Sequence, residues 1–334
     1  MGEKIRMAHG SGGRLMHQLI GDIFAARFGG DAGVHGDDAA ELPTTEPPLA
    51  FTVDSFVVKP LFFPGGDIGK LAVCGTVNDL AAKGARPEFL SAAFVLEEGL
   101  EVSVLERIAE SMARTAEEAG VRIVTGDTKV VERGGADQLY ITTSGVGRIL
   151  PGVHISGGLA RPGDRVVVTG PLGDHGMAVL VARGELEVKG DLESDCAPLG
   201  GLVMAVLERG VEVHVLRDPT RGGLATTLVE IAHRSGVRIV LEEEALPVRP
   251  HVARACELLG LDPLYVANEG KMTAVLPESM VEPFLQVVRS RPEGKDAAVV
   301  GRVEEGEPGV VLHTRVGGMR PVIMLEGDPL PRIC

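Results

Sequence analysis

Aspartates recur beside glycine or small residues in the first half of the chain. They stand in the segments HGDDAA, TVDSF, TVNDLAAKGA and TGDTK, as Asp37, Asp38, Asp54, Asp79 and Asp127. Carboxylates gathered at one place repel one another unless a cation neutralises them, and hard oxygen ligands favour Mg²⁺, usually together with substrate phosphates. Any one of these aspartates alone fits a turn or an N-cap equally well. As a set, they indicate a site for Mg²⁺ and phosphate.

Two loops of the second half carry further candidates. In RDPTRGGLATTLVEIA, Asp218 precedes Gly222 and Gly223, whose backbone N–H groups open a predicted helix. Such a helix start is a natural phosphate site, although a simply capped helix fits the same residues. In ANEGKM, Glu269 and Lys271 precede a predicted strand, where they fit either a reactive loop or a solvated turn.

The chain ends in EGDPLPRIC, with Cys334 as its last residue. A prenylation motif needs its cysteine fourth from the end, so that motif is excluded. Pro329 and Pro331 lack a backbone N–H and disfavour a helix, which leaves an extended arm of about 20–25 Å from Asp328 onward. The arm fits either a carrier of a chemical group or a frayed terminus. We hypothesise that Arg332 guides the arm or activates the thiol.

Composition limits the classes of function. The chain has 334 residues, 44% of them hydrophobic, and a formal net charge of −14, which disfavours nucleic-acid binding. No apolar run approaches the length of a membrane span, and the first residues contain no signal-peptide core, so a cytoplasmic protein is expected. The four cysteines are far apart and form no CxxC pair, which disfavours a zinc ribbon or a disulfide framework.

The elements that must position these residues alternate between strand and helix. Strands are expected at 49–58, 87–98, 121–131 and 138–149, with helices at 67–84 and 103–119 on one face of their sheet. The strand at 49–58 is expected to be buried. A linker at 151–164 leads to a second unit with strands near 165–170, 238–245, 271–277, 297–305 and 309–315. Its helices are expected near 175–184, 199–210, 222–236, 250–260 and 280–291.

This pattern predicts an α/β protein of two domains, at 1–155 and 156–324, followed by a flexible tail at 325–334. A glycine loop at 8–14, AHGSGGR, fits a phosphate cover or a mobile terminus. Neither a Walker A motif nor a GxGxxG that follows a strand is present, so any ATP site must belong to another fold.

The segments HGDDAA, VDSF, VNDLAAKGARP, TGDTKV, DPTRGGL and NEGK, in this order, resemble one superfamily. It comprises the ATP-using enzymes related to aminoimidazole ribonucleotide synthetase, with a PurM-like fold, and includes selenophosphate synthetase and thiamine-monophosphate kinase. The opening MAHGSGGR and the closing PRIC resemble the HypE family of hydrogenase maturation factors, since the sibling families lack the cysteine tail.

The resemblance implies a fold and an activity. The fold would be an N-terminal α/β domain that pairs its sheet with a second copy in a homodimer, a C-terminal α+β domain and an extended tail. The activity would be ATP-dependent dehydration of a carbamoyl group that HypF places on the terminal thiol. The resulting cyano group would pass to iron on the HypC–HypD complex, for the NiFe hydrogenase centre.

The resemblance also implies roles for single residues. Asp37, Asp38, Asp54, Asp79 and Asp127 would be the Mg-ATP ligands. Asn78 and the Gly222–Gly223 turn would help bind phosphates. Lys129 and Glu269 would contact the thiocarboxamide and move its protons, and Cys334 would carry it.

Two alternatives stay open at this point. Another enzyme of the superfamily would phosphorylate a small molecule and would not require Cys334. A selenophosphate synthetase, however, would be expected to carry a cysteine or selenocysteine with a lysine in the glycine loop, and AHGSGGR has neither. A nucleotide-binding assembly scaffold would use Cys334 as a redox or metal tether without turnover.

Overall fold

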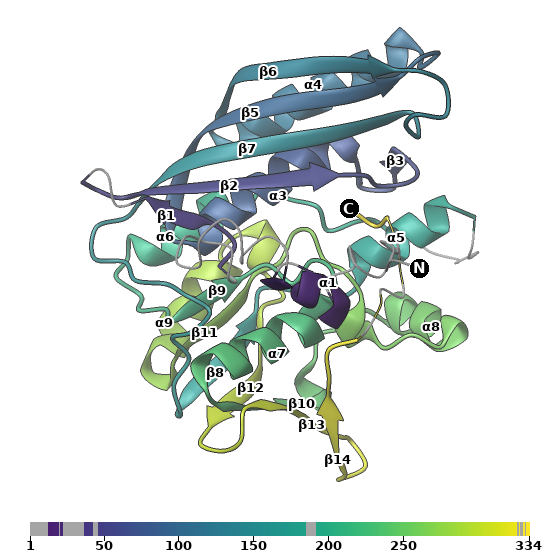
Figure 1. Cartoon of the computed structure of the whole chain (residues 1–334). Coiled ribbons are helices and arrows are strands. Elements are labelled where there is room, and N and C mark those ends of the chain that lie inside the picture. The colour runs from purple at the N-terminus through teal and green to yellow at the C-terminus, as the bar shows by residue number, and fades with distance from the viewer. Residues whose placement is uncertain are drawn as a thin grey trace.

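The computed structural model describes residues 13–19, 21–22, 37–42, 46–184, 192–325, 327, 330 and 332–334. They form two α/β units, each built on its own sheet, and the C-terminus lies between the two units (Figure 1). The predicted glycine loop at 8–14 lies outside the described residues except for Gly13 and Arg14. Within the described part of the chain, no helix has both the length and the apolar character needed to cross a membrane.

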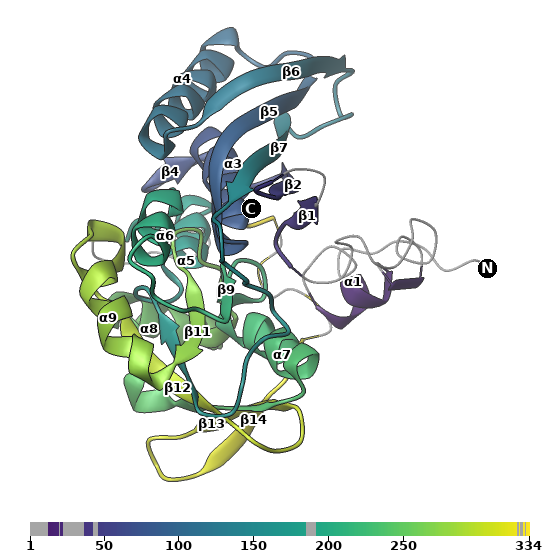
Figure 2. The ribbon, with the colours of Figure 1, turned by 90° about the vertical axis from the view of Figure 1, so that its left-hand side faces the viewer.

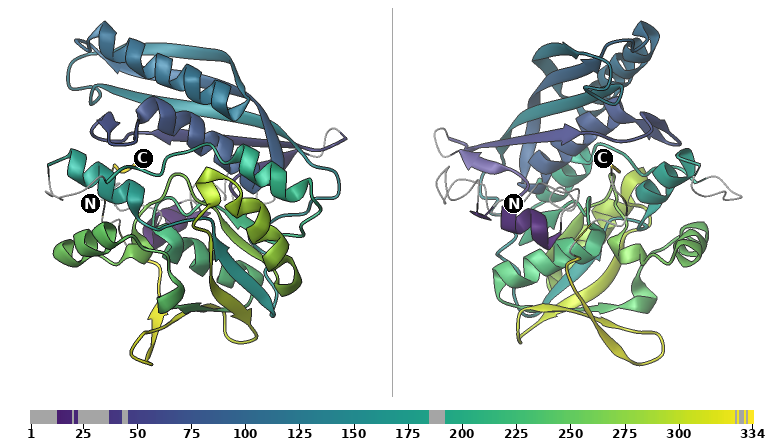
Figure 3. Two further views of the ribbon diagram at one scale, coloured as in Figure 1. Left: turned by 180° about the vertical axis from the view of Figure 1, so that it is seen from behind. Right: turned by 45° about the vertical axis from the view of Figure 1, so that its right-hand side comes forward.

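The N-terminal unit is a five-stranded mixed sheet in the order β1-β2-β7-β5-β6. Only β5 and β6 run parallel. The strands are β1 (Ala40–Leu42), β2 (Leu49–Phe56), β5 (Ala85–Glu97), β6 (Arg122–Val131) and β7 (Leu139–Ile149), with a small hairpin of β3 (Phe62–Phe63) and β4 (Gly66–Asp67). The helices α3 (Ile68–Ala82) and α4 (Val102–Ala119) cover one face, as predicted (Figure 3, left).

The prediction that the strand at 49–58 is buried was wrong, because the helices cover only one face of the sheet. Along β2, Thr52 and Phe56 point into the protein, whereas Phe51 is 40% and Val53 is 58% exposed. The strand therefore has the alternation of a half-buried strand, with one open face.

Helix α3 is the central element of the fold. The carboxylate of Asp67 caps its N-terminus by accepting the N–H groups of Gly69 and Lys70. The helix contacts β2, β5 and β7 on one side and α6 and β9 on the other. A helix enclosed on all sides must be apolar nearly all round, and its sequence IGKLAVCGTVNDLAA meets that requirement. The two polar residues in its last turns, Asn78 and Asp79, are therefore conspicuous.

The C-terminal unit is a seven-stranded sheet in the order β14-β13-β10-β12-β8-β11-β9. Its strands are β8 (Asp164–Val168), β9 (Val215–Arg217), β10 (Arg238–Glu242), β11 (Thr273–Pro277), β12 (Ala298–Glu304), β13 (Gly309–His313) and β14 (Met319–Val322). Its helices are α5 (Asp174–Ala182), α6 (Gly200–Leu207), α7 (Gly223–Ser235), α8 (Pro250–Leu259) and α9 (Glu278–Arg289), with short 3₁₀ turns η3 (Glu243–Ala245), η4 (Pro263–Tyr265) and η5 (Pro292–Gly294).

Helices pack on both faces of this second sheet. One core joins α7 to the sheet through Leu224, Leu228 and Val166, and another joins α6 and α9 through Leu202 and Phe284. The short helix α1 (Arg14–Leu19) lies beside α7 (Figure 2), where His17 Nε2 is 2.9 Å from Glu230 Oε1.

Candidate active site

Three carboxylates from different parts of the chain meet between the two units. Oxygens of Asp38, Asp79 and Asp218 all lie within 4.8 Å of one another. Asp38 stands just before β1, Asp79 in the last turn of α3, and Asp218 directly after β9. Both units therefore contribute to the cluster. The sequence pointed to Asp38 and Asp79, whereas Asp218 was noted only as part of a glycine turn.

The electrostatics of this cluster favour a bound cation. Burial raises the pKa of Asp38, Asp79 and Asp218, that of Asp218 to about 6, and their mutual repulsion raises the first two further. The guanidinium of Arg217, 2.5 Å from Asp38, compensates only in part. The other oxygen of Asp38 is buried and has no hydrogen-bond partner among the described residues. A divalent ion with hard oxygen ligands would satisfy these groups.

Asp54 lies beside the same cluster. Burial raises the pKa of Asp54, while Arg221 opposes the change, and the charge of Asp54 in turn raises the pKa of Asp79. Two residues earlier on β2, the Thr52 hydroxyl lies 2.8 Å from an oxygen of Asp79. The strand β2 therefore supplies one acidic group and one group that orients Asp79.

Asp37 is not part of the cluster, in contrast to its expected role as a ligand. Its carboxylate accepts hydrogen bonds from four donors, at 2.9–3.1 Å: Lys83 Nζ, Ser156 Oγ, the Gly157 N–H and Arg234 Nη1. These donors come from the end of α3, the linker and the end of α7. Asp37 therefore fastens the two units together, and its oxygens are already occupied.

This clamp predicts an acid-sensitive stability. Burial alone would raise the pKa of Asp37, but Gly157, Lys83 and Arg234 outweigh it and lower the pKa to about 2. A depressed carboxyl pKa stabilises the fold above its unfolded value near 4, and this stabilisation is lost as the pH falls toward 2. Urea unfolding should show Asp37→Asn less stable than the wild type by about 2 kcal/mol near pH 6, converging with it toward pH 2. A pH-independent difference would contradict the clamp.

The residues expected to bind phosphate are engaged within the protein. The amide of Asn78 donates to the Ala197 carbonyl at 3.1 Å and accepts the Leu199 N–H at 2.7 Å, which ties α3 to the start of α6. Gly222 and Gly223 have φ of +78° and +61°, and the Gly223 N–H is donated to the Thr220 carbonyl. In this state Asn78 positions its neighbour Asp79, and the glycine turn positions Asp218.

Within one chain, Asp127 and Lys129 are remote from the cluster. Both lie on the exposed edge strand β6 and pair with each other, with Nζ 2.7 Å from the carboxylate. The order β2-β7-β5-β6 places them three strands, or roughly 14 Å, from Asp54. Asp127 pairs with Ala93 of β5. Asp54 pairs with Thr143 of β7, which in turn pairs with Ala92 of β5. Because Ala92 and Ala93 are consecutive on a strand, the two carboxylates point to opposite faces of the sheet.

Glu269 is buried, so the solvated-turn interpretation of ANEGKM was wrong. Its side chain is 3% exposed, and its Oε1 has no partner among the described residues. Burial raises its pKa well above the usual range, and the neighbouring Cys196, Asp218 and Asp54 add to the shift. The carboxyl of Glu269 therefore lies close to the acidic cluster and binds a proton more readily than an exposed glutamate does.

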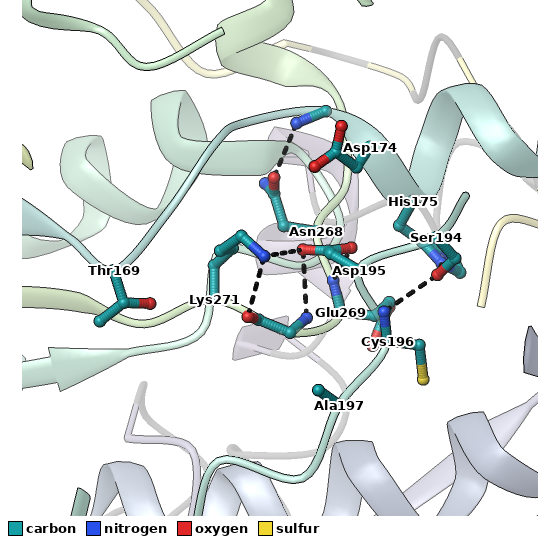
Figure 4. Close-up of polar contacts among 12 residues, drawn as sticks. Thr169, Asp174, His175, Ser194, Asp195, Cys196, Ala197, Asn268, Glu269 and Lys271 are labelled. Carbon is teal, nitrogen blue, oxygen red and sulfur yellow. Dashed lines mark hydrogen bonds and ion pairs between the residues drawn. The ribbon is translucent and has the colours of Figure 1, made fainter. Parts of the chain in front are cut away.

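Asp195 holds the loop that carries Glu269 (Figure 4). Its carboxylate accepts the N–H groups of Glu269 at 3.1 Å and Gly270 at 3.3 Å, and Lys271 Nζ lies 3.3 Å away. A Cβ on Gly270 would come within 1.7 Å of the Asp195 carbonyl, so the loop can approach the segment of Asp195 this closely only because residue 270 is a glycine. No sequence pattern pointed to Asp195, which stands in the irregular stretch ESDCAPLG.

The described residues of the tail are docked against the body of the protein. Val57 donates its N–H to the Cys334 carbonyl at 3.1 Å, and Lys59 donates to the Arg332 carbonyl at 3.2 Å. Leu330 and Ile333 are buried in the core that also contains Met177 and Cys196. Arg332 binds Asp137 at 2.6 Å and the Val57 carbonyl at 3.0 Å, which agrees with a guiding role.

Comparisons with known proteins agree with this architecture. Models of the AIR synthase related family match at residues 36–149, for its N-terminal domain, and 161–313, for its C-terminal domain. "Carbamoyl dehydratase HypE" of Rhodobacter capsulatus is 53% identical over 99% of this chain and 98% of its own length. The chain belongs to the HypE family.

Solved HypE structures have the same fold. A HypE in complex with ATP has 48% identity, a TM-score of 0.84 and coverage of 99% of this chain and 100% of its own. The HypE of a HypE–HypF complex has 47% identity and a TM-score of 0.87, with coverage of 92% and 99%. "Carbamoyl dehydratase HypE" of Escherichia coli K12 is 46% identical over 99% of both chains. The predicted PurM-like two-domain fold and membership of this enzyme family are confirmed.

Proposed function

We propose that this protein dehydrates a carbamoyl group carried on the Cys334 thiol to a cyano group, at the expense of ATP, to supply cyanide ligands for the iron of NiFe hydrogenase. One observation carries the proposal. The tail that ends in Cys334 is bound by His175, which contacts Ser194, and the next residue, Asp195, holds the backbone of the buried Glu269. HypE relatives named carbamoyl dehydratase, and a HypE structure solved with ATP, support this assignment.

The chemistry requires a phosphoryl transfer and two proton losses. The amide oxygen of Cys334 Sγ–C(=O)–NH₂ takes the γ-phosphoryl group of ATP, because a bare amide oxygen is a poor leaving group. The C–O bond then breaks, the nitrogen loses two protons, and Sγ–C≡N, phosphate and ADP result. Because the group is bound covalently to the tail, the step is effectively intramolecular, which can lower the barrier by up to about 7–11 kcal/mol.

Glu269 is suited to accept a proton in this step. A general base works best when its pKa lies near the working pH, and burial moves the pKa of Glu269 upward from its usual range. Because Asp195 fixes the backbone on both sides of its Cα, the carboxyl is held in place before the substrate arrives.

The residues present fit Mg²⁺. Asp38, Asp79 and Asp218, with Asp54 beside them, would hold the ion, which would neutralise charge on the phosphates of ATP. Asp218 replaces Asp37 in the ligand set that the sequence implied. Arg217 and Arg221 lie close enough to Asp38 and Asp54 to affect their pKa values and add positive charge.

We also propose a homodimer in which Asp127 and Lys129 complete the site of the partner subunit. The edge strand β6 is exposed along its length, and apolar Val53 and Val95 lie on the open face of the sheet. An exposed, long edge strand with apolar neighbours favours pairing with another chain. A two-fold axis at this face would bring both residues to a site that they cannot reach within their own chain.

Mixed dimers test this arrangement. Asp79→Asn and Asp127→Asn homodimers should both be inactive, whereas a mixed dimer purified through two affinity tags should regain about half of the wild-type activity, because one of its two shared sites is intact. A mixed dimer of Asp79→Asn with Asp218→Asn is the control. In this control dimer both sites are defective, because one site lacks Asp79 and the other lacks Asp218. Absence of any recovery would contradict the shared site.

The proposed partners are the carbamoyltransferase HypF as donor and the HypC–HypD complex as acceptor of the cyano group, all in the cytoplasm. A HypE has been solved in complex with HypF, which supports the first of these. To present Cys334 to these partners, the tail would have to release its hydrogen bonds with Val57, Lys59 and His175 and the buried side chains of Leu330 and Ile333.

Intact mass spectrometry tests the function directly. The protein is incubated with a carbamoyl donor system, Mg²⁺ and ATP, and Cys334→Ser serves as the matched control. We expect a carbamoyl adduct on Cys334 that loses one water only when ATP is hydrolysed. No adduct at Cys334, with the donor system shown to be active, would favour the alternative function, phosphorylation of a small molecule. An adduct with ATP binding but without turnover would favour the scaffold.

A further inference from the structure

His175 lies where the tail meets the body of the protein. It stands in the first turn of α5, its side chain is fully buried, and its ring packs edge-on against Phe63 at 5.3 Å between centroids. Its Nε2 is 2.8 Å from the Ile333 carbonyl oxygen, and its Nδ1 is 2.8 Å from Ser194 Oγ. Nothing in the proposed chemistry uses this histidine.

The surroundings fix the tautomer of the ring. A carbonyl oxygen can only accept, so Nε2 must carry the proton that binds Ile333. Ser194 Oγ accepts the Cys196 N–H at 3.1 Å, and its own hydrogen is then directed to Nδ1. Burial lowers the pKa of His175, which keeps the ring neutral and makes this single tautomer consistent with both contacts.

The other contacts show that the tail is recognised by its backbone. The Arg332 carbonyl accepts from the Lys59 N–H and from Arg183, the Ile333 carbonyl from His175, and the Cys334 carbonyl from the Val57 N–H. His175 provides the only buried side-chain donor of this set within the described residues. Because the Ile333 carbonyl belongs to the peptide bond that begins Cys334, holding it restricts where the thiol can lie.

We propose that His175, oriented by Ser194, is a positioning residue that seats the C-terminal tail through the Ile333 carbonyl. Ser194 and Asp195 are consecutive, so one segment fixes both the seat of the tail and the loop of Glu269 (Figure 4). The seating of the tail stands on geometry alone, whereas its consequence for dehydration rests on the proposed function.

Alkylation of Cys334 tests the seat in the full-length protein. Iodoacetamide modification is followed residue by residue by mass spectrometry, and the buried thiols of Cys74 and Cys256 report whether each variant is folded. His175→Leu should raise the rate at Cys334 about five- to tenfold, because a buried hydrogen bond is lost and the seated fraction falls. His175→Gln, which keeps an N–H donor at similar reach, should stay within about twofold of the wild type.

Ser194→Ala provides an independent variant. It leaves the ring in place but no longer fixes its tautomer, so the Cys334 rate should rise by about threefold. An unchanged rate in His175→Leu, or equal rises in His175→Leu and His175→Gln, would overturn the proposal, because the donor would then not matter. Alkylation of Cys74 and Cys256 would reveal that His175→Leu fails to fold. In that case, an unchanged alkylation rate of Cys334 in Ser194→Ala overturns the proposal.

Single-turnover kinetics connect the seat to the reaction. With the carbamoyl group loaded on Cys334, His175→Leu should lower the dehydration rate in proportion to the fall in the seated fraction and leave the KM for ATP unchanged. A changed KM with an unchanged rate would overturn the positioning role. If Cys334 is never loaded in the wild type, the proposed function fails while the alkylation result still decides the seat.

Discussion

Replacing Asp218 by asparagine is expected to lower ATP turnover at least about 100-fold, because it removes one of three carboxylates that converge within 4.8 Å. The side chain is nearly isosteric, and Asp218 makes no ion pair that holds the two units together within the described residues. Burial raises the pKa of this group, so its neutral replacement should not destabilise the fold. Single-turnover ADP formation by the carbamoylated protein, over a range of Mg²⁺ concentrations, measures the effect.

Asp37→Asn is the matched control, because the sequence favoured Asp37 as a ligand whereas the structure places Asp218 in the cluster instead. Asp37 is bound by four donors and lies outside the cluster, so its replacement should lower thermal stability and leave the Mg²⁺ dependence of turnover close to that of the wild type. If Asp37→Asn loses turnover and Asp218→Asn does not, the ligand set proposed from the structure is wrong.

Replacing Glu269 by glutamine is expected to slow dehydration by about 10²–10⁴-fold, the range that a positioned general base contributes. Its buried carboxyl has no partner for Oε1 among the described residues, so the amide can occupy the same space. Single-turnover mass spectrometry of the loaded protein measures loss of water, and nucleotide binding measured separately should be unchanged.

The stability of Glu269→Gln separates a catalytic from a structural role. A carboxyl whose folded pKa is raised binds more protons in the folded than in the unfolded state, so its cost to stability grows as the pH rises above the unfolded value near 4.5. At pH 7 the glutamine variant should therefore be at least as stable as the wild type. A variant that is both slow and markedly less stable would point to a structural role instead.

Local patterns in the sequence determined the elements and their grouping. Alternation and helical spacing placed α3, α4 and the strands on either side of them, because a side chain's burial repeats with the period of its own element. The motif order also identified Asp38, Asp54, Asp79, Glu269 and the terminal thiol as candidates. Residue type and spacing alone indicated the aspartates, whereas the roles of Glu269 and Cys334 came from the resemblance to a known family.

The tertiary structure decided which candidates meet. Asp37 and Asp38 are adjacent, yet Asp37 binds the linker while Asp38 joins the cluster. Strand order separated Asp127 from Asp54, and no local pattern encodes strand order. Asp218 became visible as a ligand only when the two units packed together. Asp195 and His175 became visible only through the folding of the C-terminal unit and the docking of the tail, since their partners lie far away along the chain.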